Sequence, residues 1–74
     1  KIEYRANYIK LGLKIAYYRK LRGVTQEQLA ERISKSAAFI GHVEAPNINK
    51  ANLWLFDIAR VLNVPAYKFL DFDD

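Results

Sequence analysis

Few side chains in this chain could carry out catalysis or hold a metal ion. His42 is the single histidine among 74 residues, and there is no cysteine. The sequence contains no glycine-rich loop that could cradle a phosphate and no motif of paired carboxylates. A nucleophile, an acid–base pair and a metal site all lack candidates. The sequence therefore predicts no enzyme, no metal, no cofactor and no small-molecule substrate.

Charge is unevenly distributed along the chain, whose formal net charge is +4. Residues 1–35 carry nine Lys or Arg and three Asp or Glu, whereas residues 36–74 carry three and five. A basic half of this kind favours a polyanionic partner, although charged residues also simply solvate a surface. Charge alone leaves both interpretations open.

Hydrophobic residues make up 51% of the sequence, but the apolar runs are only a few residues long. This content predicts a folded core with some apolar surface left outside it. A helix that crosses a bilayer needs about 20 apolar residues, and a chain without disulfides suits a reducing compartment. We therefore expect a single soluble, cytoplasmic domain over residues 1–74, with no membrane partner.

Prolines and glycines are sparse in this sequence, so we expect helices to form its scaffold and to position any functional residues. Helical spacing of Leu11, Ile15 and Tyr18 predicts a first helix over about residues 8–22. Gly23 is placed to end it, because glycine tolerates the left-handed conformation that closes many helices.

Two short helices follow. Thr25 and Gln28 match a capping box at the start of the second helix. Ser36 is the N-cap candidate of a third helix that ends near Val43. A fourth helix carries Leu55, Ile58, Ala59 and Leu62, and Pro65 is placed as the first residue of a short fifth helix that ends near Leu70. The fold class is thus a compact all-α domain of five helices.

Two short helices joined by a turn of three to four residues are the sequence form of a helix-turn-helix. The residues resemble the phage repressor and Cro type (XRE-like) of this motif over roughly residues 9–70. The similarity is carried by Arg19, by the run Thr25-Gln26-Glu27-Gln28-Leu29-Ala30-Glu31-Arg32-Ile33, by Ile40, Val43 and Glu44, and by Ile58, Ala59, Leu62, Asn63 and Val64.

This resemblance implies a transcriptional regulator that binds double-stranded DNA sequence-selectively, as a homodimer with the third helix in the major groove. It further implies that Gln26, Asn47 and Lys50 contact DNA phosphates. Arg19 and Glu44 resemble the family's internal ion pair, which joins the first helix to the end of the third.

The base-facing positions implied by the resemblance are Ser36, Ala37, Ala38 and His42. Here the sequence departs from the family pattern, since these positions usually carry amide or basic side chains. Alanine can contact a thymine methyl group but offers no hydrogen bond. Ser34 stands where the family commonly has a turn glycine, and a polar residue can adopt the left-handed region at some cost.

The candidate dimer face comprises Pro65, Ala66 and Tyr67, with Trp54 as an addition. Trp54 falls in a helix turn that is normally polar in the family, so it is either a partner site or a core-packing residue. Together with Phe56 it also keeps an alternative function open, in which a helix-turn-helix fold serves as a protein–protein interaction module.

Overall fold

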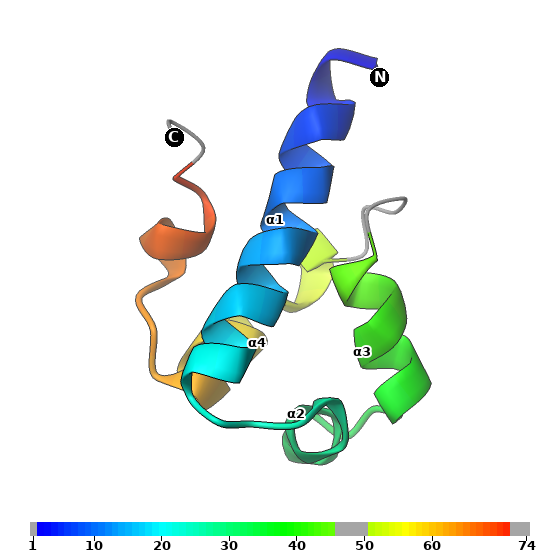
Figure 1. Cartoon of the computed structure of the whole chain (residues 1–74), viewed down its shortest axis with the longest axis vertical. Coiled ribbons are helices and arrows are strands. Elements are labelled where there is room, and N and C mark those ends of the chain that lie inside the picture. Colours follow the sequence, from blue (N-terminus) through cyan, green and yellow to red (C-terminus); the bar gives the residue numbers. More distant parts are fainter. Residues whose placement is uncertain (1, 46–50, 72–74) are drawn as a thin grey trace.

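The computed structural model describes residues 2–45 and 51–71, with side chains for residues 6–45 and 54–71. Four α-helices follow one another along the chain, and a 3-10 helix comes last (Figure 1). Their bounds are α1, Ile2–Leu21; α2, Gln26–Arg32; α3, Ala37–Glu44; α4, Ala51–Leu62; and the 3-10 helix η1, Ala66–Phe69. The all-α prediction is confirmed for the described residues.

Two predicted boundaries need correction. The fifth helix is a single 3-10 turn, and Pro65 is its N-cap rather than its first residue. The first helix begins at Ile2 instead of near residue 8. Residues 2–7 contain neither proline nor glycine, so no residue in that segment breaks a helix. The prediction rested on the spacing of apolar residues from Leu11 onward and began only three residues before it, so it missed the earlier turns.

Three helices end in the same way, each with one residue in the left-handed region: Gly23 (φ 71°), Ser34 (φ 59°) and Asn63 (φ 56°). In each case the amide of that residue donates to the carbonyl three residues earlier, and the next amide donates to the carbonyl five residues earlier, at 2.8–3.2 Å. These are Schellman motifs, which pair the last carbonyls of a helix. The predicted stop at Gly23 and the left-handed Ser34 are both confirmed.

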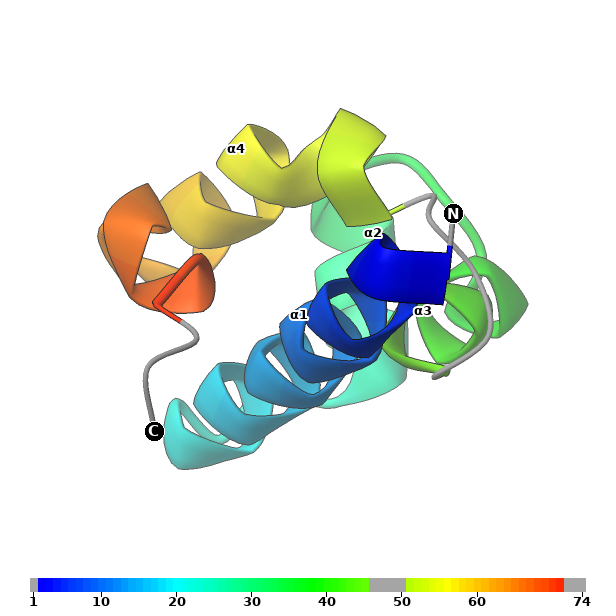
Figure 2. The same cartoon turned by 90° about the horizontal axis from the view of Figure 1, so that it is seen from above.

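A single core joins the helices, which surround it as Figure 2 shows from above. Phe69 of η1 is fully buried, and its ring meets the ring of Tyr18 edge-on with centroids 5.1 Å apart. Full burial of one such side chain contributes about 1.5–3 kcal/mol. The other buried apolar residues are Leu11, Ile15, Leu29, Ala30, Ile33, Ile40, Val43, Leu55, Ile58, Ala59, Leu62 and Val64.

Gly12 allows α1 to pass very close to the end of α3. A Cβ atom at this position would lie 3.0 Å from the carbonyl oxygen of Glu44 and 3.1 Å from that of Val43. A larger residue would push the two helices apart. This close crossing sets the distance between α3 and Arg19, which lies two turns farther along α1.

Candidate nucleic-acid interface

Side-chain caps define where α2 and α3 begin. Thr25 Oγ1 accepts a hydrogen bond from the amide of Gln28 at 3.0 Å, and Gln28 Oε1 accepts one from the amide of Thr25 at 2.9 Å. The predicted capping box is therefore present. Ser36 Oγ likewise accepts a bond from the amide of Phe39 at 3.1 Å. With Ser34 in the left-handed region, these caps leave only a short turn between the two helices.

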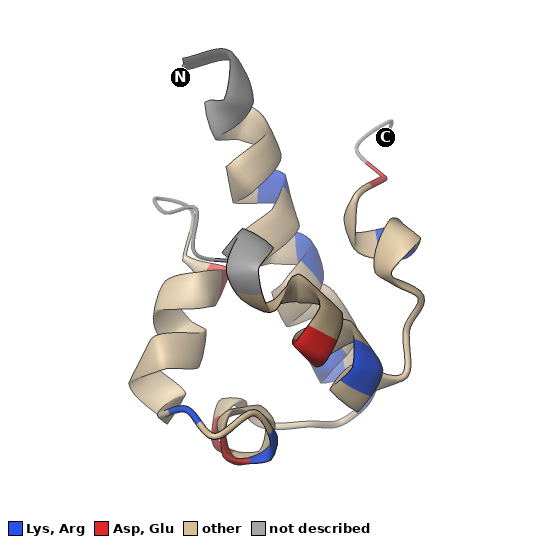
Figure 3. Cartoon of the chain, turned by 180° about the vertical axis from the view of Figure 1, so that it is seen from behind, with Lys and Arg blue, Asp and Glu red and all other residues tan. Residues whose placement is uncertain are grey.

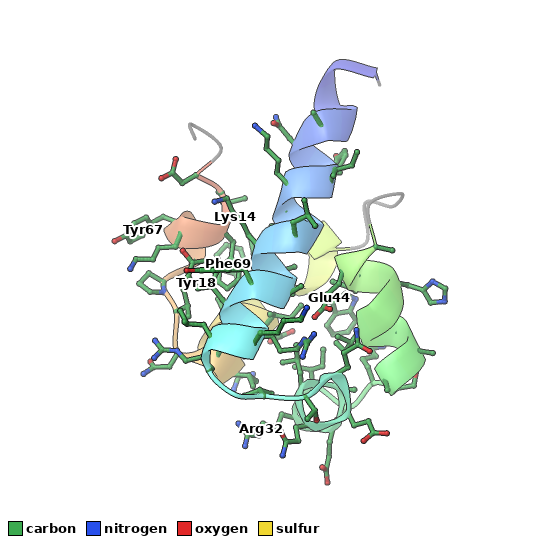
Figure 4. The ribbon with its side chains drawn as sticks, in the orientation of Figure 1. Lys14, Tyr18, Arg32, Glu44, Tyr67 and Phe69 are labelled. Carbon is green, nitrogen blue, oxygen red and sulfur yellow. The ribbon has the colours of Figure 1, made fainter. Side chains whose placement is uncertain are left out.

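Arg19 and Glu44 form a bidentate ion pair between α1 and the end of α3. Arg19 Nε donates to Glu44 Oε2 at 2.6 Å, and Nη2 donates to Oε1 at 3.2 Å. Both side chains are more than nine-tenths buried. Arg19 Nη1 also donates to the carbonyl of Val24 at 2.8 Å. One guanidinium thereby links α1, the segment before α2 and the end of α3, and Figure 4 shows Glu44 pointing from α3 toward α1.

Gln26, the residue expected to contact phosphate, belongs to the same network. Its Nε2 donates to Glu44 Oε1 at 3.1 Å, and the side chain is half-buried. An amide nitrogen carries two hydrogens, so one bond to Glu44 leaves the other for an external acceptor. Glu44 thus orients the group that we expected to meet DNA.

The outer face of α3 is formed by Ala37, Ala38, Gly41 and His42. Ala38 and His42 are exposed and stand one turn apart, as do the half-buried Ala37 and Gly41. A Cβ atom on Gly41 would meet nothing within 4 Å, so the space outside the helix is open there. On the opposite side of α3, Ile40 and Val43 are buried in the core. The exposed Ser36 uses its hydroxyl as the cap of α3.

Comparison with known proteins identifies this arrangement. A family model described as helix-turn-helix matches residues 15–69, three quarters of the chain. The chain belongs to the helix-turn-helix family of the repressor and Cro type. A relative is the uncharacterized HTH-type transcriptional regulator YazB of Bacillus subtilis (strain 168), which is 36% identical over 55 residues. The match covers 74% of this chain and 80% of YazB. No solved structure matches the chain.

A second cluster, formed by Lys35, Phe39 and Trp54, braces the helix-turn-helix against α4. The rings of Phe39 and Trp54 meet edge-on with centroids 5.7 Å apart, and Lys35 Nζ lies 4.3 Å from the centroid of Trp54. A cation–π contact of this kind contributes about 0.5–2 kcal/mol. Sequence reasoning missed this cluster. The spacing of four residues between Lys35 and Phe39 is the one signal that could have indicated a contact between them.

Arg22 is a further residue that sequence reasoning missed. Its Nε donates to the carbonyl of Leu62, and its Nη2 donates to the carbonyl of Asn63, both at 2.9 Å. These carbonyls end α4, where helix geometry leaves them without helical partners. Arg22 therefore joins the end of α1 to the end of α4. Its contact with Leu62 spans 40 residues of sequence, so sequence spacing could not predict it.

The residues predicted for a dimer face lie at η1 and on α4. Pro65 and Tyr67 are exposed and Ala66 is half-buried, all at η1. Trp54 lies eight residues before the end of α4, a distance of about 12 Å along that helix, and its half-buried ring packs against Phe39 of α3. Asn47 and Lys50, the other expected phosphate contacts, lie outside the described residues.

Within residues 2–45 and 51–71, no three His, Cys, Asp or Glu side chains gather in a way that could hold a metal ion. No helix within those ranges has the length and apolar character needed to cross a membrane.

Proposed function

We propose that this chain binds double-stranded DNA sequence-selectively as a transcriptional regulator, with α3 in the major groove. The observation that carries the proposal is the outer face of α3, which is open to solvent and lined by small side chains while its inner face is locked into the core. A major groove about 12 Å wide admits an α-helix. The similarity to YazB, which is described as an HTH-type transcriptional regulator, supports the same function.

Phosphate contact is assigned to Gln26. The ion pair with Arg19 compensates the charge of Glu44, and Glu44 in turn fixes the amide of Gln26 through one hydrogen. The second hydrogen of that amide can donate to a phosphate oxygen. Such a contact sets the position of the protein on the duplex without reading sequence.

Base reading is assigned to Ala37, Ala38 and His42. The two alanines offer methyl contacts to thymine, and His42 offers a hydrogen bond to a base or a phosphate. Gly41 adds no side chain between them, so the helix axis can approach the base edges closely. We therefore expect this face to prefer DNA sites that contain thymine, because alanine cannot form the bidentate hydrogen bonds that select guanine or adenine.

Binding as a homodimer completes the proposal, because one short helix buries too little surface for tight specific binding at physiological salt. Two half-sites about 34 Å apart would match two copies of α3. Pro65, Ala66 and the 69% exposed Tyr67 are the residues we assign to the contact between copies.

Selection of bound duplexes from a random DNA pool tests the function. The wild type should return two related half-sites enriched in thymine. Ala38→Gln should change the preferred base at one position of each half-site, and Ala6→Gln, the same substitution at an exposed position of α1, should leave the selected site unchanged. A featureless outcome for all three proteins would show that α3 does not read bases. Failure of all three to bind DNA at low salt would favour the protein-interaction alternative.

A further inference from the structure

The outward side of α1 carries a ridge of large apolar side chains that no part of the described chain covers. Leu13, Tyr17 and Leu21 are 57%, 59% and 62% exposed. They follow one another at intervals of four residues, so they line one side of the helix over about 12 Å. Isolated exposed apolar residues are ordinary, but a contiguous row marks a surface that meets a partner. We call these three residues the α1 ridge.

A groove runs along the α1 ridge. It has a volume of about 310 Å³ and is lined by Lys10, Leu13, Lys14, Tyr17 and Tyr18. Figure 4 shows Lys14 and Tyr18 on the side of α1 that faces η1. The rings of Tyr17 and Tyr18 meet edge-on with centroids 5.0 Å apart, and Tyr18 rests on the buried Phe69. The aromatic wall is therefore anchored to the core.

The charged residues of α1 from residue 6 onward are all basic. No Asp or Glu occurs from residue 6 to residue 26, whereas Lys10, Lys14 and Lys20 lie on α1, and Figure 3 shows blue without red along its described length. Lys10 and Lys14 also take part in other interactions. Lys20 is exposed.

This charge decides which partner fits. If α1 paired with α1 of a second copy, lysines would face lysines, which is unfavourable. Nucleic acid would satisfy the lysines but would leave Leu13, Tyr17 and Leu21 uncovered by apolar groups. A helix with apolar anchors on one face and carboxylates beside them satisfies both features, in the helix-in-groove mode of recognition.

We propose that the α1 ridge and its groove bind an acidic amphipathic helix of a partner protein. Apolar side chains of that helix pack on Leu13, Tyr17 and Leu21, and its Glu or Asp residues lie beside the lysines of α1. Figure 1 shows α3 and η1 on opposite sides of α1. Lys14 and Tyr18, which line the groove, lie on the η1 side (Figure 4). The partner can therefore bind while the outer face of α3 stays open. Tyr67, which we assign to the contact between copies, lies on the same side of α1 as this groove (Figure 4).

Synthetic peptides can test this surface on the intact chain. The probe is an 18-residue helical peptide with leucines at alternating three- and four-residue spacing and glutamates beside them. Its controls are the same peptide with lysines in place of glutamates, a scrambled glutamate peptide, and vesicles that contain anionic lipid. Binding is measured by fluorescence anisotropy of the labelled peptide at several salt concentrations.

The glutamate peptide should bind the wild type, more weakly as salt rises, and both control peptides should bind far less. Tyr17→Ala should weaken its binding by about tenfold. Phe56→Ala, which removes an aromatic ring that is 73% exposed on α4, should leave binding unchanged. Circular dichroism checks that both variants fold.

Three results would overturn the proposal. The first is equal binding of the glutamate, lysine and scrambled peptides, or equal binding by wild type and Tyr17→Ala. The second is sedimentation of the free chain as a dimer that Tyr17→Ala converts to a monomer, since a second copy would then cover the ridge. The third is binding to anionic vesicles without binding to the peptide.

Discussion

The outer faces of α3 and α1 are both open to solvent, yet they differ in almost every chemical respect. On α3 the exposed positions carry small or polar groups, as Ala38 and His42 do. On α1 they carry large apolar side chains such as Leu13 and Tyr17. A helix face with small side chains fits into the confined major groove. Large apolar side chains instead suit the core of a protein–protein interface, from which water is excluded.

The two faces are nevertheless held in one rigid unit. Arg19 projects from α1 and pairs with Glu44 at the end of α3, and Gly12 permits the close crossing that brings them together. Side-chain size and polarity, rather than exposure, distinguish the face we propose to read DNA from the face we propose to bind a protein. The predictions below alter first the link between the faces and then each face in turn.

The largest effect on stability is expected from removing the Arg19–Glu44 ion pair, which joins α1 to the end of α3. Arg19→Ala and Glu44→Ala should each lower the free energy of unfolding by about 3–5 kcal/mol, because each leaves a buried charge without its partner. Urea denaturation measures this loss, which is a large part of the total stability of a domain, about 5–15 kcal/mol.

The control is the exposed pair of Arg60 and Asp57, 3.4 Å apart with side chains 72% and 46% exposed. Arg60→Ala should cost no more than about 1 kcal/mol, as is usual for surface pairs. If Arg19→Ala is as mild as Arg60→Ala, the link between α1 and α3 has been assigned wrongly.

Next comes the effect of removing the phosphate contact. Gln26→Ala should weaken binding to the selected site and to an unrelated duplex by the same factor, equivalent to about 1.5–3 kcal/mol for a hydrogen bond to a charged group. Electrophoretic mobility shifts with both duplexes measure the two affinities. A loss confined to the selected site would instead make Gln26 a base-reading residue.

A smaller effect is expected at the turn that orients α3. Ser34→Gly should raise the free energy of unfolding by about 1 kcal/mol, because glycine adopts the left-handed region without the cost that other residues bear. Asn63→Gly, at the matching position after α4, should change stability less, since asparagine tolerates this region better. Thermal unfolding of the two variants provides the test, and equal shifts would show that the side chain at position 34 is not strained.

The smallest effect is expected on the α1 ridge. Leu13→Ser should change the free energy of unfolding by no more than about 0.5 kcal/mol, as is usual for surface substitutions, and should leave DNA affinity unchanged. Calorimetry and mobility shifts measure these quantities. A large loss of stability would mean that Leu13 supports the core, and the contrast between the two faces would then fail.

Local chemistry accounts for what the sequence alone could predict. The capping box at Thr25, the cap at Ser36 and the stop at Gly23 each depend on residues a few positions apart, so their spacing identifies them. Helical spacing also selected Leu11 and Ile15 correctly as core residues of α1. The positions of Arg19 and Glu44 came from the family resemblance, because nothing in their spacing of 25 residues predicts a contact.

Contacts between distant segments account for what the sequence could not predict. Arg22 caps α4, and Lys35 stacks on Trp54, only after the helices have packed. The α1 ridge could not be predicted for another reason. Two rows of apolar residues run along α1, and helical periodicity alone does not show that the row containing Tyr17 is exposed to solvent. Phe69 of η1 is fully buried against residues far away in the sequence, so its contacts also form only in the folded chain.

A salt titration of DNA binding tests the central claim most directly. The affinity of the wild type is measured for its selected site and for an unrelated duplex between low and physiological salt. Our account predicts that both affinities fall linearly on a log–log plot, and that the selected site stays at least about 1,000-fold tighter. Equal affinity for the two duplexes, or no binding to either at low salt, would contradict it.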